Sequence, residues 1–253
     1  MVCPSGAMRR THAADCLENP APRSSLVGYH AKITAHPGAP FFVRARDNPR
    51  MKTLCVYCGS NAGNDPAYAI LSRALGKRLA GEGIALVYGG GNVGLMGIVA
   101  DAVLEHGGEV VGVIPQQLVD WEVAHKGVTR LEVVDSMHSR KARMFELADG
   151  FVALPGGFGT LDEMFEMLTW RQLGLGRKPC AFLGVNGFWQ PLMAMLDTMV
   201  RERFLHPEQR QDMWHGGDID ALLAWMQAYV PAHADKWLDE KRRSQLKLTT
   251  EDV

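Results

Sequence analysis

The chain has 253 residues, of which 47% are hydrophobic, and its formal net charge is −1. This length and composition suffice for one domain with a sizeable core. The near-neutral charge gives no electrostatic reason to expect nucleic acid or an anionic membrane surface as a partner. No apolar run approaches the ~20 residues that a membrane helix needs, and five sparse cysteines without an export signal predict reduced thiols and a cytoplasmic protein.

The first fifty residues differ from the rest of the chain. Residues 1–50 are rich in Pro, Arg, His and Ala, and they follow neither a strand period nor a helix period. We expect a disordered N-terminal extension there. The favoured explanation is a wrongly assigned start, with Met51 as the natural first residue. A transit peptide is the weaker alternative, because Asp15 and Glu18 lie where such peptides avoid acids.

From Met51 onward, short apolar runs alternate with helical patterns. Nearly unbroken apolar strands are typical of strands covered by helices on both faces. The alternation therefore predicts an α/β domain over 51–230 with a doubly wound, mostly parallel sheet, followed by a charged tail at 231–253. Strands are expected at 52–58, 84–88, 109–114, 130–134, 150–154 and 179–185. Helices are expected at 66–81, 93–106, 136–148, 160–174, 188–203 and 218–229.

The first expected strand contains Cys55 and Cys58 in a C-x-x-C spacing. Residues three apart in a strand point to opposite faces of the sheet. A zinc or redox pair needs both sulfurs on one side, so the spacing predicts two separate buried cysteines rather than such a pair.

The second expected strand leads into a glycine-rich loop, Gly89–Gly97, which contains G-x-G-x-x-G before a helix. That motif raises the possibility of an NAD site. An NAD site is disfavoured because the loop follows the second strand, and Gln116 lies near the position where an acid should bind the ribose. A tight turn without ligand contacts is the structural alternative. We favour Gly90 and Gly91 as a backbone wall of a nucleotide pocket.

The helix expected at 136–148 carries two cations on its apolar side. Arg140 and Lys141 fall within the arc of Met137 and Met144 on a helical wheel, and Ser136 can cap the helix. The two side chains could reach past the apolar surface to solvent, or they could point into a cavity that holds an anion. The planar fork of Arg140 suits phosphate or carboxylate.

A second glycine loop, Pro155–Thr160, follows the strand expected at 150–154. Its glycines are expected to adopt positive φ and to let a ligand approach the backbone. Thr160 is expected to begin the next helix, whose free N–H groups and dipole would bind a phosphate. The Lys-Ser/Thr pair of a Walker loop is missing, so magnesium-assisted phosphoryl transfer is not indicated.

Glu163 lies one turn into that helix and has two interpretations. Thr160-x-x-Glu163 has the spacing of a capping box, in which the glutamate serves the backbone. The helical wheel favours the other interpretation, because apolar residues flank Glu163 on both sides of the helix. A carboxylate covered in this way needs a partner, and Arg140 is the candidate.

Three motifs together resemble the Lonely Guy (LOG) family, whose members are cytokinin riboside 5′-monophosphate phosphoribohydrolases that often carry the label lysine decarboxylase. The family patterns P-G-G-x-G-T-x-x-E, M-H-x-R-K and G-G-G-x-x-G-L-M-G match residues 155–163, 137–141 and 89–97 in order and spacing. The resemblance covers roughly 51–230 and is highly specific.

This resemblance implies a Rossmann-like fold, a homodimer, no cofactor or metal, and cleavage of a nucleoside 5′-monophosphate to free base and ribose 5-phosphate. By position it implies Arg140 and Glu163 as the catalytic pair. The implied substrate-binding residues are Lys141, Gly156, Gly157, Phe158, Gly159, Thr160, Asp162, Glu122 and Thr169.

Four other functions are weighed against cytokinin activation. An AMP nucleosidase would perform the same reaction on a different nucleotide, and a nucleotide sensor would bind without cleavage. An NAD(P)-dependent oxidoreductase lacks its ribose acid, as described above. A lysine decarboxylase needs a lysine that holds pyridoxal phosphate, and the sequence places no lysine in a recognisable setting for it.

Overall fold

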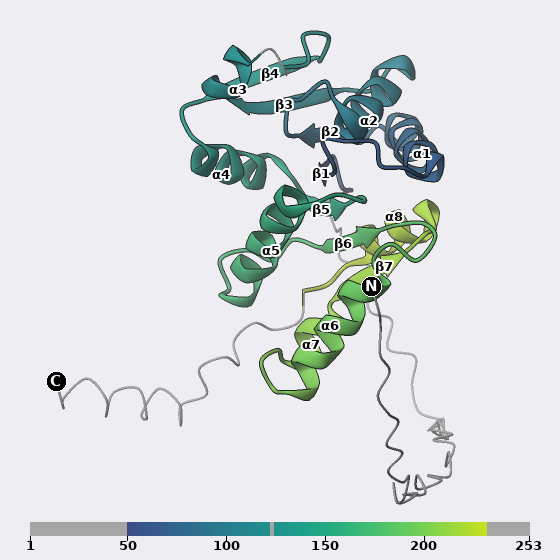
Figure 1. The fold of residues 1–253 in the computed structure, drawn as a ribbon, viewed down its shortest axis with the longest axis vertical. Coiled ribbons are helices and arrows are strands. Elements are labelled where there is room, and N and C mark those ends of the chain that lie inside the picture. The colour runs from purple at the N-terminus through teal and green to yellow at the C-terminus, as the bar shows by residue number, and fades with distance from the viewer. Residues whose placement is uncertain (1–49, 122–123, 232–253) are drawn as a thin grey trace, which may run out of the picture. The chain divides into compact units, whose positions relative to one another are not determined.

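The computed structural model describes residues 50–121 and 124–231. A seven-stranded sheet with strand order β4-β3-β2-β1-β5-β6-β7 forms its centre, and every pairing in it is parallel (Figure 1). The predicted α/β fold is confirmed. The predicted disorder of the N-terminal extension and most of the predicted charged tail concern residues outside the described part of the chain.

The elements agree closely with the sequence pattern. The strands are β1 Thr53–Tyr57, β2 Ala85–Tyr88, β3 Val110–Pro115, β4 Arg130–Val134, β5 Gly150–Ala153, β6 Cys180–Leu183 and β7 Met213–Gly216. The helices are α1 Pro66–Glu82, α2 Gly94–Glu105, α3 Gln116–Asp120, α4 Met137–Leu147, α5 Phe158–Gln172, α6 Gln190–Arg201, α7 Pro207–Gln211 and α8 Ile219–Ala228.

Three elements were not predicted: α3, α7 and β7. Each is short and has no run of apolar residues, whereas β2, β5 and β6 are equally short but nearly all apolar. β7 is a strand because it pairs with β6, with Met213 opposite Cys180. Its sequence, MWHG, does not distinguish it from a turn.

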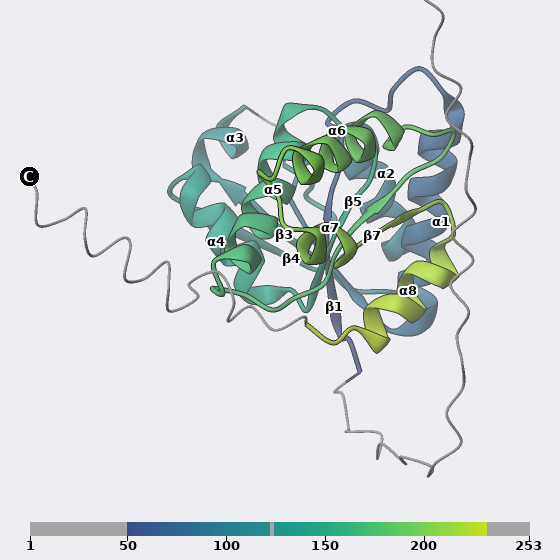
Figure 2. The ribbon, with the colours of Figure 1, turned by 90° about the horizontal axis from the view of Figure 1, so that it is seen from below.

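Helices cover both faces of the sheet and divide the core in two (Figures 1 and 2). On one face α1, α2 and α8 bury leucine and valine side chains such as Leu75, Val99 and Leu222. On the other face α4, α5 and α6 bury a methionine-rich set that includes Met144, Met164 and Met193. This arrangement explains why the central strands are apolar throughout.

The two faces also separate the cysteines of the first strand. Cys55 lies in the core beneath α4 and α5, whereas Cys58 lies in the core beneath α1 and α2. Both thiols are free and buried, and burial raises the pKa of each. The prediction that they do not form a pair is confirmed.

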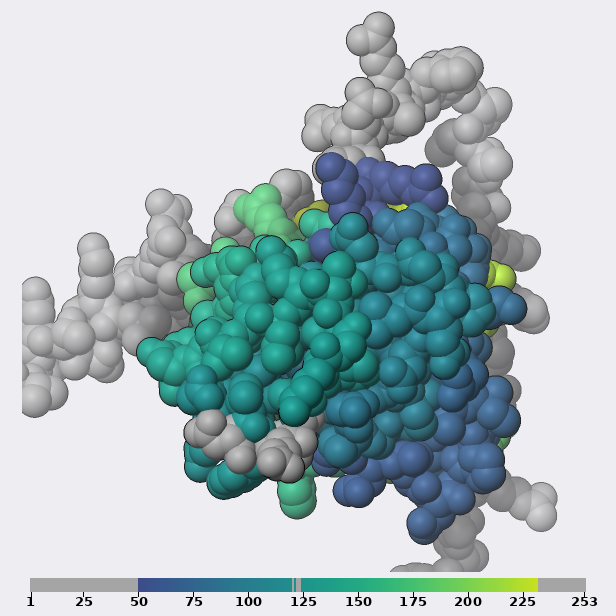
Figure 3. Space-filling view, turned by 90° about the horizontal axis from the view of Figure 1, so that it is seen from above, coloured from purple at the N-terminus to yellow at the C-terminus, as the bar shows by residue number. Residues whose placement is uncertain are grey.

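β1 lies at the point where the strand order reverses, between β2 on one side and β5 on the other. In doubly wound sheets a crevice opens at this switch point, beyond the carboxyl ends of the strands. The loops after β1, β2 and β5 meet there. Figure 3 shows a face on which the surface of residues near 60–105 (blue) adjoins that of residues near 110–150 (teal). Among the described residues, no helix is long and apolar enough to cross a membrane.

The close packing of α1 against α2 gives a test of the energetics of the fold. A Cβ added to Gly76 on α1 would lie 2.7 Å from the Ala102 Cβ and 2.7 Å from the Val99 carbonyl oxygen on α2. Gly76→Ala is therefore expected to lower the free energy of unfolding by about 1–3 kcal/mol, because it overpacks this contact. Urea denaturation measures the change.

Gly81 on the same helix is the matched control, because a Cβ added there meets nothing within 4 Å. Gly81→Ala should leave the free energy of unfolding unchanged or raise it by up to about 1 kcal/mol through helix propensity. Equal destabilisation by the two substitutions would contradict the packing argument.

Candidate active site

A cavity of about 560 Å³ lies at the switch point of the sheet. This volume is in the usual range for small-molecule sites. Three loops form its walls, one after each of β1, β2 and β5, and the side chains of Arg140 and Glu163 face into it. The lining residues are Cys58–Gly63, Tyr68, Gly89, Gly91, Val93, Leu95, Met96, Ile114, Leu118, Arg140, Pro155–Thr160, Glu163 and Phe188.

Arg140 is held firmly against the loop after β2. Ser136 caps α4 by accepting a hydrogen bond from the Ser139 N–H (3.1 Å), and Arg140 follows within the first turns. Its Nε donates to the Val113 carbonyl oxygen (3.1 Å) and its Nη2 to that of Gly89 (3.4 Å). The side chain is 9% exposed, so of the two alternatives for Arg140 the structure excludes the one in which it reaches past the apolar surface to solvent.

Position 89 needs glycine because the guanidinium of Arg140 lies where a Cβ would be. A Cβ added to Gly89 would lie 2.0 Å from Arg140 Nη2. A Cβ makes no non-bonded contact so short, so a larger residue would displace the guanidinium. The first glycine loop therefore makes room for the side chain of Arg140, which its motif does not reveal.

Glu163 is not part of a capping box. α5 begins at Phe158 with Gly157 as its N-cap, two residues before the predicted start. Glu163 thus lies in the second turn of the helix, 8% exposed, too far along for a capping role. The interpretation of Glu163 as a buried carboxylate with a partner is the correct one.

The partner is Arg140, whose Nη1 lies 3.2 Å from Glu163 Oε1. Burial raises the pKa of Glu163 above its ordinary value, and the positive charge of Arg140 opposes that rise. A carboxyl with a perturbed pKa and a specific charge partner in a cavity is typical of a catalytic acid or base.

The glycines of the second loop serve close approach rather than positive φ. Positive φ among these loops occurs at Gly90 (74°) and Gly94 (56°) of the first loop instead, so that prediction was wrong for residues 156, 157 and 159. A Cβ on Gly156 would collide with Thr160 Oγ1 at 2.1 Å, whereas one on Gly157 would meet nothing within 4 Å. Bare backbone at Gly157 and Gly159 is therefore open to a ligand.

The start of α5 offers backbone donors to the cavity. In the described part of the chain no side chain caps this helix, in contrast to α1 and α4, where Asp65 and Ser136 do so. Its first N–H groups and the positive end of its dipole are consequently available to an anion.

The structure brings most of the predicted site residues together. Gly91, Arg140, Gly156, Gly157, Phe158, Gly159, Thr160 and Glu163 line the cavity. Four others are absent from the described lining: Gly90, Lys141, Asp162 and Thr169. Gly90 packs toward Ile114 and Leu131, and Lys141 pairs with Asp162. Glu122 lies outside the described residues.

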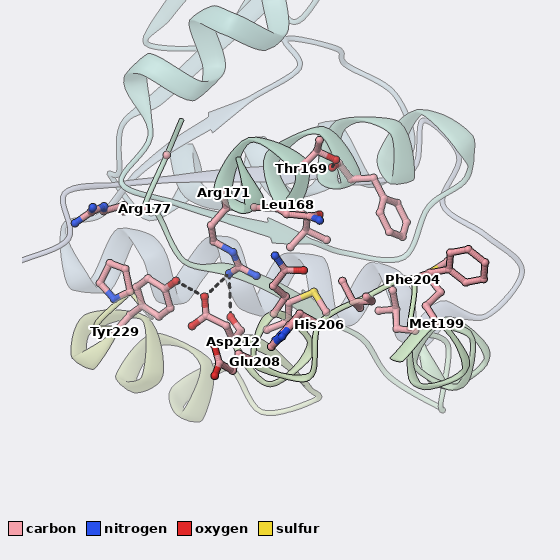
Figure 4. A pocket seen from close by; sticks show the side chains of 18 residues that line it. Leu168, Thr169, Arg171, Arg177, Met199, Phe204, His206, Glu208, Asp212 and Tyr229 are labelled. Carbon is pink, nitrogen blue, oxygen red and sulfur yellow. Dashed lines mark hydrogen bonds and ion pairs between the residues drawn. The ribbon is translucent and has the colours of Figure 1, made fainter. Parts of the chain in front are cut away.

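Thr169 lies at a second, smaller cavity of about 290 Å³ between α5, α6 and α7 (Figure 4). Its hydroxyl donates to the Phe165 carbonyl oxygen (2.7 Å). Arg171 lies beside it, with Nη1 donating to the Asp212 carbonyl oxygen (2.9 Å), and Tyr229 donates to Asp212 Oδ2 (2.7 Å). The geometry gives Thr169 no contact with the Arg140–Glu163 cavity.

Sequence reasoning missed the loop after β1. Gly59–Gly63 supplies a third wall, and the Leu95 N–H at the start of α2 donates to the Gly59 carbonyl oxygen (3.0 Å). Tyr68 and Phe188 add an aromatic wall, with ring centroids 5.5 Å apart. The run of small residues after the first strand, GSNAG, was the available signal.

The buried pair predicts a specific stability pattern. Arg140→Met should lower the free energy of unfolding by about 3 kcal/mol at neutral pH, because it leaves Glu163 buried and unpaired. Adding Glu163→Gln should restore part of that loss. Urea denaturation of the single and double variants measures the coupling.

Arg143→Met is the control on the same helix. Arg143 is 38% exposed and pairs with Glu132 and Glu146, so its loss should cost less than about 1 kcal/mol. A double variant no more stable than Arg140→Met would show that the pair does not carry the effect.

The chain is a doubly wound α/β protein in which an uncapped helix start and a buried carboxylate lie side by side at a cavity at the switch point of the sheet. Solved structures show the same fold. The molybdenum cofactor binding protein of Rippkaea orientalis is 21% identical with a TM-score of 0.55 over 71% of this chain and 98% of that one. The carrier protein MCP of Chlamydomonas reinhardtii is 19% identical with a TM-score of 0.54, again over 71% and 98%.

Sequence relatives define the family. A family model described as "Possible lysine decarboxylase" matches residues 96–225. A probable cytokinin riboside 5′-monophosphate phosphoribohydrolase of Oryza sativa subsp. japonica is 43% identical, covering 74% of this chain and 83% of the relative. The enzyme of that name from Rhodococcoides fascians is 44% identical, covering 72% and 92%. The chain belongs to the LOG family of cytokinin riboside 5′-monophosphate phosphoribohydrolases.

Proposed function

We propose that this protein hydrolyses the N-glycosidic bond of a cytokinin riboside 5′-monophosphate, releasing the free base and ribose 5-phosphate. The relatives at 41–44% identity carry the name of this activity. The observation that carries the proposal is the Arg140–Glu163 pair, 3.2 Å apart on the wall of a cavity of nucleotide size.

The phosphate is assigned to the start of α5. The open N–H groups of this helix and the bare backbone at Gly157 and Gly159 form an anion site. Binding energy from the phosphate, which does not react, can position and distort the sugar. The ribose then lies between this anchor and Glu163.

Glu163 is assigned to the bond-breaking step. Cleavage of an N-glycosidic bond passes through a sugar with oxocarbenium character, as glycoside hydrolysis does. A carboxylate beside the anomeric carbon stabilises that positive charge. It can also take a proton from the attacking water, whose oxygen bonds to the anomeric carbon while the bond to the base breaks.

Arg140 keeps Glu163 in its ionised form. Its hydrogen bonds to Val113 and Gly89 fix the guanidinium, and its charge favours the ionised form of Glu163. Without that charge, burial alone would favour the protonated acid, which cannot accept a proton from water.

The base is assigned to the apolar part of the cavity. Ile114, Leu118 and Phe188 supply aliphatic and aromatic surface there. A purine presents flat apolar faces to such walls. Exposed Val93 and Phe158 at the lining, 39% and 94% exposed, are suited to contact an apolar substituent on the base.

Lysine decarboxylation finds no support in the geometry. Lys141, the lysine beside the site, is engaged by Asp162 and Glu166 and does not line the cavity among the described residues. Pyridoxal phosphate chemistry needs a lysine whose amine is free to react with the aldehyde.

Glu163→Gln tests the proposal. The variant should lose turnover by about 10²–10⁴-fold, the scale of one acid–base group, while it still binds nucleotide. Chromatography of reactions with isopentenyladenosine monophosphate and AMP measures the free base, and calorimetry measures binding. The two substrates distinguish cytokinin activation from an AMP nucleosidase.

Glu146→Gln is the matched control, since Glu146 is an exposed residue that pairs with Arg143 at the surface. It should leave turnover unchanged. Near-normal turnover in Glu163→Gln would remove Glu163 from its role. Binding without any base release by the unaltered protein would indicate a sensor instead.

We also propose that the protein is a homodimer, as the family resemblance implies. Large apolar side chains are exposed around the end of α5 and on α6 and the turn after it. Leu173, Leu175, Met195 and Phe204 are 65%, 65%, 53% and 81% exposed. A second copy that covers them would remove this apolar area from water.

Sedimentation equilibrium tests the dimer. The unaltered chain should sediment at twice its monomer mass, and Phe204→Glu should shift the equilibrium toward monomer, because a charge is costly inside an apolar interface. Ile70→Glu on α1, at a position that is 67% exposed, should leave the mass unchanged. A monomer at all concentrations would refute the proposal.

A further inference from the structure

α5 carries three acidic residues within five positions, Asp162, Glu163 and Glu166. α4 presents two cations to them. Arg140 pairs with Glu163, and Lys141 pairs with the two flanking carboxylates. Three like charges on one helix turn would repel one another and favour protonation of the most buried member, which is Glu163.

Lys141 is placed to counter that repulsion. Its Nζ donates to Asp162 Oδ2 at 3.1 Å and lies 3.0 Å from Glu166 Oε2. The lysine side chain is 15% exposed and that of Glu166 is 20% exposed, so solvent screens this contact less than a surface pair. Burial lowers the pKa of Lys141, but the two carboxylates outweigh it and the pKa is raised overall. Lys141 therefore remains charged.

We propose that Lys141 is a positioning residue for the hydrolysis. By neutralising Asp162 and Glu166 it keeps Glu163 in its carboxylate form. Its two ion pairs also hold α5 against α4, in the position in which Glu163 contacts Arg140. Lys141 is not among the described residues that line the cavity, so the role is argued from its ion pairs. It rests on the proposed role of Glu163 in the reaction.

The other groups that face Glu163 do not change this charge balance near neutral pH. Cys55 and Tyr57 of β1 and Cys58 after it are buried, and burial raises the pKa of each. β5 contributes no titratable side chain, and His138 on α4 is exposed. Burial raises the pKa of Glu163 most, and the charges that act on it besides are those of Arg140, Asp162, Lys141 and Glu166.

The proposal predicts pH shifts of opposite sign. Glu163 acts as a carboxylate, so kcat/KM falls as the pH drops through its pKa. Lys141→Met removes a positive charge, raises that pKa and should move the acid limb of kcat/KM up by about 0.5–1 pH unit. Glu166→Gln removes a negative charge and should move the limb down. The double variant should return near the unaltered profile.

Two further variants separate charge from structure. Lys141→Arg keeps the positive charge and should restore most of the unaltered profile. Arg143→Met removes an arginine on the same helix that pairs with Glu132 and Glu146 instead, and it should leave the acid limb in place. Loss of turnover with an unmoved limb in Lys141→Met would overturn the proposal.

A second measurement does not depend on turnover. Carbon-13 NMR of labelled glutamate carboxyls, with the Glu163 signal assigned through Glu163→Gln, reports the pKa of Glu163 directly. Lys141→Met should raise it and Glu166→Gln should lower it. If the unaltered protein released no base, the proposed function would fail while this titration still decided the role of Lys141. An unchanged Glu163 pKa in both variants would refute that role.

Discussion

The site depends on one interaction, the buried ion pair between Arg140 and Glu163. Removing two charges from water is costly, and a buried pair is weak evidence for stability. Here the cost is offset by backbone carbonyls of Val113 and Gly89, which accept hydrogen bonds from the same guanidinium. The pair also joins α4 to α5, and the apolar packing of both helices on the sheet brings the two charges together.

In each of the two glycine loops beside this pair, one glycine leaves space for a neighbouring side chain. Gly89 leaves space for the guanidinium, and Gly156 leaves space for Thr160 where α5 begins. At both positions a side chain lies so close to the backbone that a Cβ would collide with it. Both glycines follow the carboxyl ends of strands, near β1, where the strand order reverses. The backbone at Gly157 and Gly159 is open, and it is there that we propose the phosphate binds. Under this proposal, packing and ligand binding depend on different glycines of the second loop.

The elements predicted from the sequence agree best with the structure where an apolar pattern extends over many residues. The apolar strands and longer helices lie within two residues of their predicted bounds, because their burial repeats along the chain. α3, α7 and β7 were not predicted because each is short and has no run of apolar residues. Glu163 shows the other limit: its spacing from Thr160 fits a capping box, yet the helix begins at Phe158 and gives the glutamate a different neighbour.

The sequence by itself determined the parallel α/β sheet, the two glycine loops and the candidacy of Arg140 and Glu163, because hydrophobic periodicity and motif spacing are local properties of the chain. The tertiary structure decided what these residues contact. It separated Lys141 and Thr169 from the cavity, added the loop after β1, and placed Gly89 beneath Arg140. Those relations join residues far apart in the chain, and only the packing of helices on the sheet sets their distances.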